Sequence, residues 1–187
     1  MKTFAIVLLL AALAVPAGAA IVWDEGTNGD LSSNPAAPTP VVLLVGSNEL
    51  LGTVNGNPLD RDYITFTIPA NQQLSHLTLI ALSPNNLAFA SFNSGSTSFA
   101  PSAATNASFL SGIHLDGNDV GDDLMLYFDT RNVTTNSLPL PMLGPGTYCW
   151  LIQQTSPIVQ SWHVNFILEG TIATDATTWG KVKALYR

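Results

Sequence analysis

Short runs of alternating apolar and polar residues, each closed by glycine, proline, asparagine or serine, constrain the fold of this chain more than any other feature. Between positions 62 and 68, for example, Ile64, Phe66 and Ile68 occupy every second position. Because side chains of an extended chain point alternately to opposite faces, this period of two is typical of a half-buried strand. No stretch of the body has a sustained helical period with capping residues, so the pattern argues against helices and against parallel βαβ units.

Nine such runs are predicted as strands, and their spacing indicates an all-β fold. We expect an antiparallel two-sheet β-sandwich, jelly-roll-like, with eight to nine strands, because each run offers one apolar face to a shared core. The predicted strands cover residues 41–45, 50–54, 62–68, 77–82, 87–92, 109–115, 124–128, 148–154 and 162–168.

Residues 1–20 have the composition of an export signal. Lys2 precedes an uninterrupted apolar run over positions 4–15, and small residues follow the run. The run is shorter than the roughly 20 residues that a membrane-spanning helix needs. We therefore expect cleavage after Ala19 or Ala20 and a secreted protein without a transmembrane segment. Behind the signal we expect a lead-in segment over 21–40, the β-sandwich domain over 41–170 and a basic tail over 171–187.

The charge balance of the chain is strongly acidic. Six basic residues stand against 13 acidic ones, for a formal net charge of −7. Residues 21–180 hold only Arg61 and Arg131 as basic groups, because three others lie in the last seven positions. This balance excludes a nucleic-acid-binding protein, which needs basic groups to neutralise phosphates. It is typical of an extracellular protein, and crowded carboxylates favour a bound cation.

Several segments of the chain resemble bacterial pre-peptidase C-terminal-like (PPC-like) domains, of the kind found in exosortase-associated exported proteins. The segments are WDE (23–25), GDLS (29–32), APTP (37–40), DRDYITFTIPA (60–70) and GPGTYCWLIQQ (144–154). The resemblance implies a non-catalytic β-sandwich that accompanies secreted enzymes or stands alone on the cell surface. It also implies that calcium or an extracellular polymer is a ligand, as in some relatives.

The first predicted calcium site combines the lead-in segment with the start of a strand. Asp60 and Asp62 point to the same side of an extended chain, and two carboxylates that close repel unless a cation intervenes. Asp24, Glu25 and Asp30 precede the first predicted strand and can pack beside that strand entry. The alternative, in which Asp60 and Asp62 only end a turn, stays open.

The second, weaker calcium prediction is the acidic loop between positions 116 and 123. Asp116, Asn118, Asp119 and Asp122 could supply several of the six to eight oxygens that Ca²⁺ prefers. The loop is not an EF-hand, because Val120 stands where a ligand is needed. The alternative is an ordinary solvated turn, in which these residue types are favoured by the backbone.

The tail over 171–187 differs from the acidic body of the chain because it is basic, and it is the predicted partner-binding segment. Trp179 is the tryptophan expected to be exposed, and Lys181, Lys183 and Arg187 would supply positive charge. The alternative, a frayed C-terminus, stays open.

Motifs for catalysis are missing from the sequence. It contains no G-x-S-x-G turn, no P-loop and no metal-ligand spacing among its histidines. The single cysteine, Cys149, lies in an apolar alternating strand, where we expect a buried thiol that acts as a small hydrophobe. We therefore expect no catalytic residue and no cofactor other than calcium.

These observations together predict a secreted, non-catalytic β-sandwich module, stabilised by calcium, for binding an extracellular protein or polysaccharide or for adhesion. Two alternatives stay open. One is a structural cell-surface component attached through its basic C-terminal tail, and the other is an accessory polymer-binding domain of a secreted hydrolase system.

Overall fold

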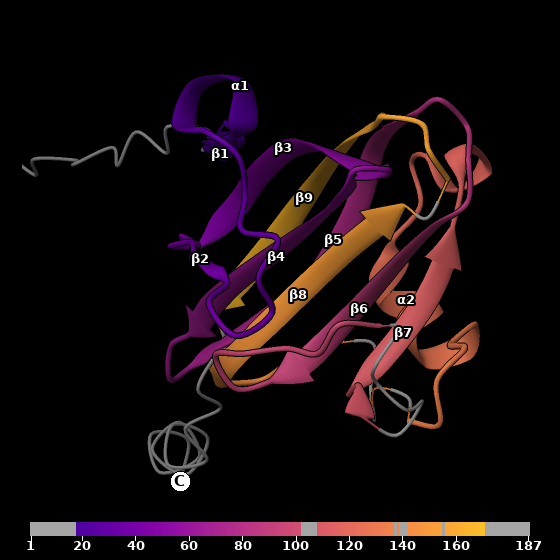
Figure 1. Cartoon of the computed structure of the whole chain (residues 1–187). Helices are drawn as coiled ribbons and strands as arrows, with labels where there is room; N and C mark the ends of the chain where they lie inside the picture. Colours follow the sequence, from indigo (N-terminus) through magenta and orange to yellow (C-terminus); the bar gives the residue numbers. More distant parts are fainter. Residues whose placement is uncertain (1–17, 102–107, 137, 139–141, 155, 171–187) are drawn as a thin grey trace, which may run out of the picture.

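Strands dominate the computed structural model, which describes residues 18–101, 108–136, 138, 142–154 and 156–170 (Figure 1). Nine strands form one curled sheet with the order β5-β9-β3-β4-β8-β6-β7, to which β1 adds beside β3 and β2 beside β4. The strands are β1 (Ala20–Asp24), β2 (Thr39–Pro40), β3 (Gly46–Gly56), β4 (Leu59–Ile68), β5 (Gln72–Ser83), β6 (Ala88–Ser94), β7 (Ser111–Leu115), β8 (Gly146–Gln154) and β9 (Gln160–Gly170). The helical turns are α1 (Glu25–Asn28), η2 (Gly117–Asp119) and α2 (Leu124–Thr130).

The sheet curls around its own core at the hairpin between β3 and β4. One section contains β1, β3, β9 and β5, and the other contains β2, β4, β8, β6 and β7. Aromatic rings from the two sections meet edge to face: Phe66 lies 5.6 Å from Phe166, and Trp150 lies 5.5 Å from Trp162, between ring centroids. The all-β prediction is confirmed, while the finer description as a two-sheet, jelly-roll-like sandwich stays a prediction.

Seven of the nine predicted strands correspond to β3 through β9, and most pairings are antiparallel as expected. The lead-in segment adds two strands that the sequence pattern did not predict. Both pair in parallel, β1 with β3 and β2 with β4. The lead-in therefore runs along both sections of the sheet.

The predicted strand at 124–128 is wrong, because these residues form helix α2. The Asp123 side chain accepts a hydrogen bond from the Met125 amide at 3.0 Å and so caps the helix. Leu124, Met125 and Phe128 are buried, and Phe128 packs against Phe92 at 4.8 Å between ring centroids. A short apolar run fits one buried helical turn as well as a strand.

The predicted strand at 41–45 is also wrong, although its alternation is correct. This segment, which we call the connecting segment, crosses from β2 to β3 with Val41 and Leu43 buried and Val42 and Leu44 exposed. The Val41 amide donates to the Thr65 carbonyl at 2.8 Å, and the Leu44 amide donates to Asn48 Oδ1 at 2.7 Å. Between these two bonds the segment forms no ladder with any strand of the described part of the chain.

None of the helices within the described residues has the length and apolar character that crossing a membrane requires. The predicted export signal at 1–20 and the predicted tail at 171–187 lie outside the described residues, apart from positions 18–20.

Candidate cation site

Asp62 is a fully buried carboxylate on the inner side of β4. Its Oδ2 accepts a hydrogen bond from Trp162 Nε1 at 2.6 Å across the core. Its Oδ1 is also buried and has no hydrogen-bond partner in the described part of the chain. Burying a charged group without a full set of partners costs several kcal/mol of folding free energy. A cation or a proton bound to this oxygen would reduce that cost.

Glu25 reaches the same place from the N-terminal turn of α1. Its Oε1 accepts from the Leu31 amide at 3.0 Å, and its Oε2 accepts from the Thr53 amide at 2.7 Å. Gly52 makes this approach possible: a Cβ there would lie 2.6 Å from Trp162 Cζ2 and 2.9 Å from Glu25 Cδ. The backbone of β3 and of the lead-in therefore fixes the Glu25 carboxylate.

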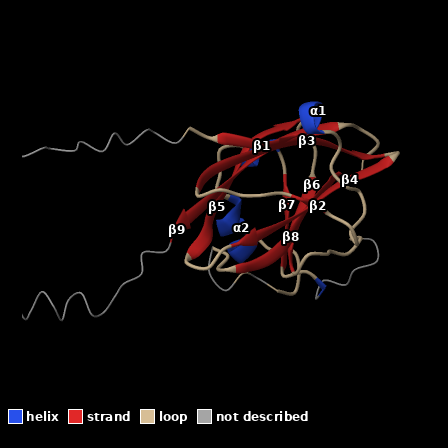
Figure 2. Cartoon of the chain, turned by 90° about the vertical axis from the view of Figure 1, so that its left-hand side faces the viewer, coloured by secondary structure: helices blue, strands red, loops and turns tan. Residues whose placement is uncertain are grey.

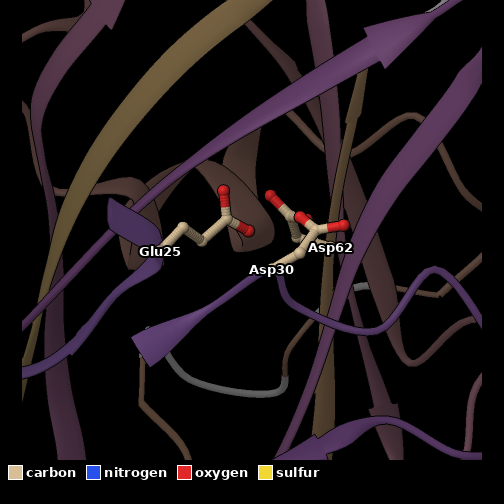
Figure 3. A group of neighbouring side chains, drawn as sticks. All are labelled: Glu25, Asp30 and Asp62. Carbon is tan, nitrogen blue, oxygen red and sulfur yellow. The ribbon is translucent and has the colours of Figure 1, made fainter. Parts of the chain in front are cut away.

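Asp30 completes the group from the lead-in segment, where its side chain is exposed. Glu25, Asp30 and Asp62 each offer one carboxylate oxygen, and the three oxygens lie within 4.8 Å of one another. Figure 3 shows the three carboxyl groups directed toward one another. The group, which we call the acidic trio, therefore joins two residues of the lead-in to one residue of β4.

The electrostatics of the acidic trio favour a positive partner. Burial, and then the charge of Glu25, raises the pKa of Asp62 well above its usual range, although the Trp162 hydrogen bond opposes the rise. Burial likewise raises the pKa of Glu25, against the hydrogen bonds from Leu31 and Thr53. No lysine or arginine among the described residues forms an ion pair with the trio, and Arg61 instead donates to Gln153 Oε1 at 2.7 Å.

The donor set suits calcium. All three ligands are carboxylate oxygens, which hard cations such as Ca²⁺ prefer, and bidentate carboxylates or water can complete six to eight positions. A divalent cation between the three groups would pair with Asp62 and offset the repulsion from Glu25 that adds to the effect of burial on its pKa. The residues present therefore fit a calcium ion.

The other two residues of the first calcium prediction flank the trio. The Asp24 side chain caps α1 by accepting from the Gly26 amide at 2.9 Å. Asp60 accepts from the Ser33 hydroxyl at 2.9 Å, and burial raises its pKa. The structure thus brings together three of the five predicted carboxylates, and it gives protein partners to Asp24 and Asp60.

In the acidic loop of the second prediction, the carboxylates accept hydrogen bonds from nearby protein groups. Asp116 accepts from the Asn118 amide at 2.7 Å, and Asp119 accepts from Arg131 Nη2 at 3.0 Å. Asp122 accepts a short hydrogen bond from the Tyr127 hydroxyl. Within the described ranges, only the acidic trio brings three potential metal-ligand side chains this close together, so the loop remains the weaker prediction.

A shallow pocket of about 300 Å³ opens beside Glu25. Its lining comes from β1, α1, β3, β5 and β9, and includes Thr53, Trp162 and His163. Glu25 is therefore open to solvent on the side of this pocket. The partner-binding residues predicted in the tail, Trp179, Lys181, Lys183 and Arg187, lie outside the described residues.

Cys149 is fully buried in β8, as its sequence context predicts, beside Tyr63, Phe109 and Leu151. Burial raises the pKa of its thiol to about 12. Because the thiolate is the reactive form, we expect the native protein to be inert toward a thiol reagent at about pH 8 and to react stoichiometrically in denaturant. The measurement is the thiol titre before and after denaturation.

A Ser94→Cys variant provides the control for that measurement, because Ser94 is exposed at the end of β6. It should react in the native state within the dead time of mixing. Stoichiometric reaction of native wild-type protein on the same timescale would contradict the prediction.

Comparison with known proteins adds little to this geometry. No family model matches the chain, and no curated protein matches it either. Among solved structures, the chain is similar to PliG of Salmonella Typhimurium, a periplasmic lysozyme inhibitor of g-type lysozyme. The two are 14% identical, and the match covers 70% of this chain and 98% of PliG with a TM-score of 0.35. So low a TM-score does not establish a shared fold, and no function follows from it.

Proposed function

We propose that this chain is an exported, non-catalytic β-module for extracellular binding or adhesion, in which a calcium ion fastens the lead-in segment to the sheet. The observation that carries the calcium site is the buried Asp62 Oδ1, which has no hydrogen-bond partner within the described residues and belongs to a group of three carboxylates. The ion would bind Glu25, Asp30 and Asp62.

The position of the trio explains what the ion would do. Glu25 and Asp30 belong to the lead-in, whereas Asp62 belongs to β4. Without a cation, repulsion among the three carboxylates would weaken the hold of the lead-in on the sheet, which then rests on the pairing of β1 with β3 and of β2 with β4. With a cation, the same groups hold it in place, so calcium would act as a structural clamp.

The sequence supports the rest of the proposal. The signal-like composition of residues 1–20 supports export. The resemblance to PPC-like domains supports a non-catalytic module and a calcium ligand.

Thermal unfolding in millimolar Ca²⁺ and in EGTA tests the proposal. A ligand present at about a hundred times its dissociation constant stabilises the folded state by about 2.7 kcal/mol, so we expect the midpoint to rise by about 5–10 °C. EGTA should reverse the rise. Glu25→Gln and Asp30→Asn should each remove most of it.

Matched controls come from carboxylates outside the trio. Glu169→Gln changes an exposed side chain, and Asp129→Asn changes a half-buried one on α2. Both should keep the full response to calcium. A wild-type midpoint that is the same in calcium and in EGTA would rule out the clamp.

A further inference from the structure

A row of four side chains crosses one face of the section that contains β4, β8, β6 and β7. Arg61 of β4 is the strand partner of Gln153 of β8. Phe89 of β6 pairs with Gln153 from the other side, and it pairs in turn with His114 of β7. Figure 1 shows these four strands side by side. Because directly opposed residues of paired strands share a face, the four side chains form one continuous line, which we call the Arg61 row.

The Arg61 row lies on the face that points away from the main core. Ala90 and Ile152, the sequence neighbours of two row residues, are buried in that core, and successive strand residues point to opposite faces. Phe89 packs instead against a separate, smaller cluster. Figure 2 shows helix α2, in blue, between β8 and β5, and its Phe128 packs against Phe92 on the core side. Helix α2 therefore does not cover the row.

Contacts within the row fix its shape and leave part of it open to solvent. Arg61 Nε donates to Gln153 Oε1 at 2.7 Å, and the rings of Phe89 and His114 meet edge to face at 5.7 Å between centroids. Arg61 also lies near the Tyr63 hydroxyl, because its charge opposes the rise that burial causes in the pKa of Tyr63. His114 is exposed, and Arg61 and Phe89 are half-buried. The row therefore presents a held guanidinium next to an aromatic surface.

The charge of Arg61 has no acidic partner in the described part of the chain. Arg61 and Arg131 are the lysine or arginine residues within the described ranges. Arg131 pairs with Asp119 at 3.0 Å and lies over the ring of Tyr127 at 3.7 Å. Arg61 forms no ion pair with any described residue, although the chain has 13 acidic residues. A guanidinium binds a carboxylate with two parallel hydrogen bonds, so Arg61 is suited to a carboxylate from outside the chain.

We propose that the Arg61 row binds the C-terminus of an extracellular protein partner, with the terminal carboxylate on Arg61 and the apolar side chain of the last residue on Phe89. Terminal carboxylates are a recurring target of peptide recognition. The strands β4 and β6 lie two strand spacings apart, about 10 Å, which the long Arg61 side chain and a large terminal side chain can bridge over Gln153. The proposal names a partner for the binding module and so rests on that proposed function, but it does not depend on the calcium ion.

Charge complementarity favours a ligand with a single carboxylate. The chain carries 13 acidic against six basic residues, so a polyanion such as a uronic-acid polysaccharide would be repelled by the rest of the surface. The row offers one arginine without an ion-pair partner among the described residues, and it places an aromatic ring beside that arginine. A peptide that ends in a large apolar residue supplies one carboxylate and one apolar group at the same position.

Calorimetric titration of the exported chain with acetyl-Gly-Gly-Phe tests the proposal, with the C-terminal amide of the same peptide as the matched ligand. We expect a Kd of about 1 mM or tighter for the free acid. The amide should bind about tenfold more weakly or worse, because it lacks the charge-assisted hydrogen bonds to Arg61. Arg61→Gln should cause the same loss for the free acid. Phe89→Leu, which keeps an apolar side chain in the row, should weaken the free acid by about threefold or more.

Arg131→Gln is the control variant, because it removes the same charge from an arginine that already has an acidic partner. It should bind the free acid as the wild type does. Absence of saturable binding up to about 10 mM, equal binding of acid and amide, or unchanged binding in Arg61→Gln would overturn the proposal. Tighter binding of oligogalacturonate than of the peptide, lost in Arg61→Gln, would also overturn it, in favour of an acidic polysaccharide. The titrations are run in calcium and in EGTA, whereas the clamp is measured by thermal unfolding, so either proposal can fail without the other.

Discussion

Replacing Asp62 with asparagine should change stability in opposite directions with and without calcium. In EGTA at about pH 8, Asp62→Asn should raise the free energy of unfolding by about 2 kcal/mol or more, because it removes a buried charge from a group of like charges. The asparagine oxygen can still accept from Trp162 Nε1, and its amide can donate to Glu25 or Asp30. In calcium the variant should be less stable than the wild type, because it lacks a charged ligand.

The pH dependence of the calcium-free protein provides a second readout of the same cause. The pKa of Asp62 is raised in the folded state, so the folded protein holds the proton at pH values where the unfolded chain has lost it. The free energy of unfolding of the wild type should therefore fall as the pH rises from about 4 through the raised pKa of Asp62. The fall should be smaller in Asp62→Asn, and what remains would come from Glu25 and Asp60, whose pKa values are also raised.

Chemical unfolding in EGTA and in calcium measures this crossover, and Asp129→Asn serves as the control because it changes a carboxylate outside the trio. A loss of stability in Asp62→Asn under both conditions would mean that the Asp62 carboxylate is satisfied without a cation. That result would contradict the structural role we assign to the acidic trio.

The two core tryptophans should respond very differently to replacement by phenylalanine. Both are buried and their rings pack edge to face, but Trp162 Nε1 donates to Asp62, whereas Trp150 Nε1 has no partner among the described residues. Trp162→Phe removes the hydrogen bond that Asp62 Oδ2 accepts, in addition to creating a cavity. We expect a loss of about 4 kcal/mol in EGTA, against about 1–2 kcal/mol for Trp150→Phe.

Urea unfolding of the two variants tests this difference directly, because they delete the same atoms from neighbouring sites. Calcium should recover part of the loss in Trp162→Phe, since the proposed ion would still pair with Asp62. Equal losses in the two variants would show that packing alone sets the cost and that the indole–carboxylate bond contributes nothing.

The sequence predicted the positions of the strands more completely than the residues of the acidic trio. Period-two alternation located β3 to β9, because a half-buried strand leaves that pattern wherever it forms. It failed at 124–128, where one buried helical turn has the same short apolar run, and at 41–45, where an extended segment alternates without a strand partner. The parallel strands β1 and β2 left no signal, because the lead-in has no long alternating run.

The acidic trio could be predicted only in part. The spacing of Asp60 and Asp62 and the acidic lead-in identified the region, because both are visible in the order of residues. Among the five carboxylates, Asp24 makes a local contact, because it caps α1. The roles of the others depend on tertiary contacts: Asp60 accepts a hydrogen bond from Ser33, and only Asp62 is buried with an unpartnered oxygen. The need for glycine at position 52 follows from the approach of Trp162 and Glu25, which no local pattern reveals.

The arrangement of β1 and β9 on either side of β3 has a mechanical consequence. Ala20 pairs with Asn48 and Leu168 pairs with Gly46. The start of β1 and the end of β9 are therefore both hydrogen-bonded near the beginning of β3. A pulling force between these two ends acts across the strands, and it loads the hydrogen bonds one after another instead of all at once. The ends of the fold would therefore yield by unzipping under tension, while the β3–β4 hairpin, at the other end of β3, would bear little of the load.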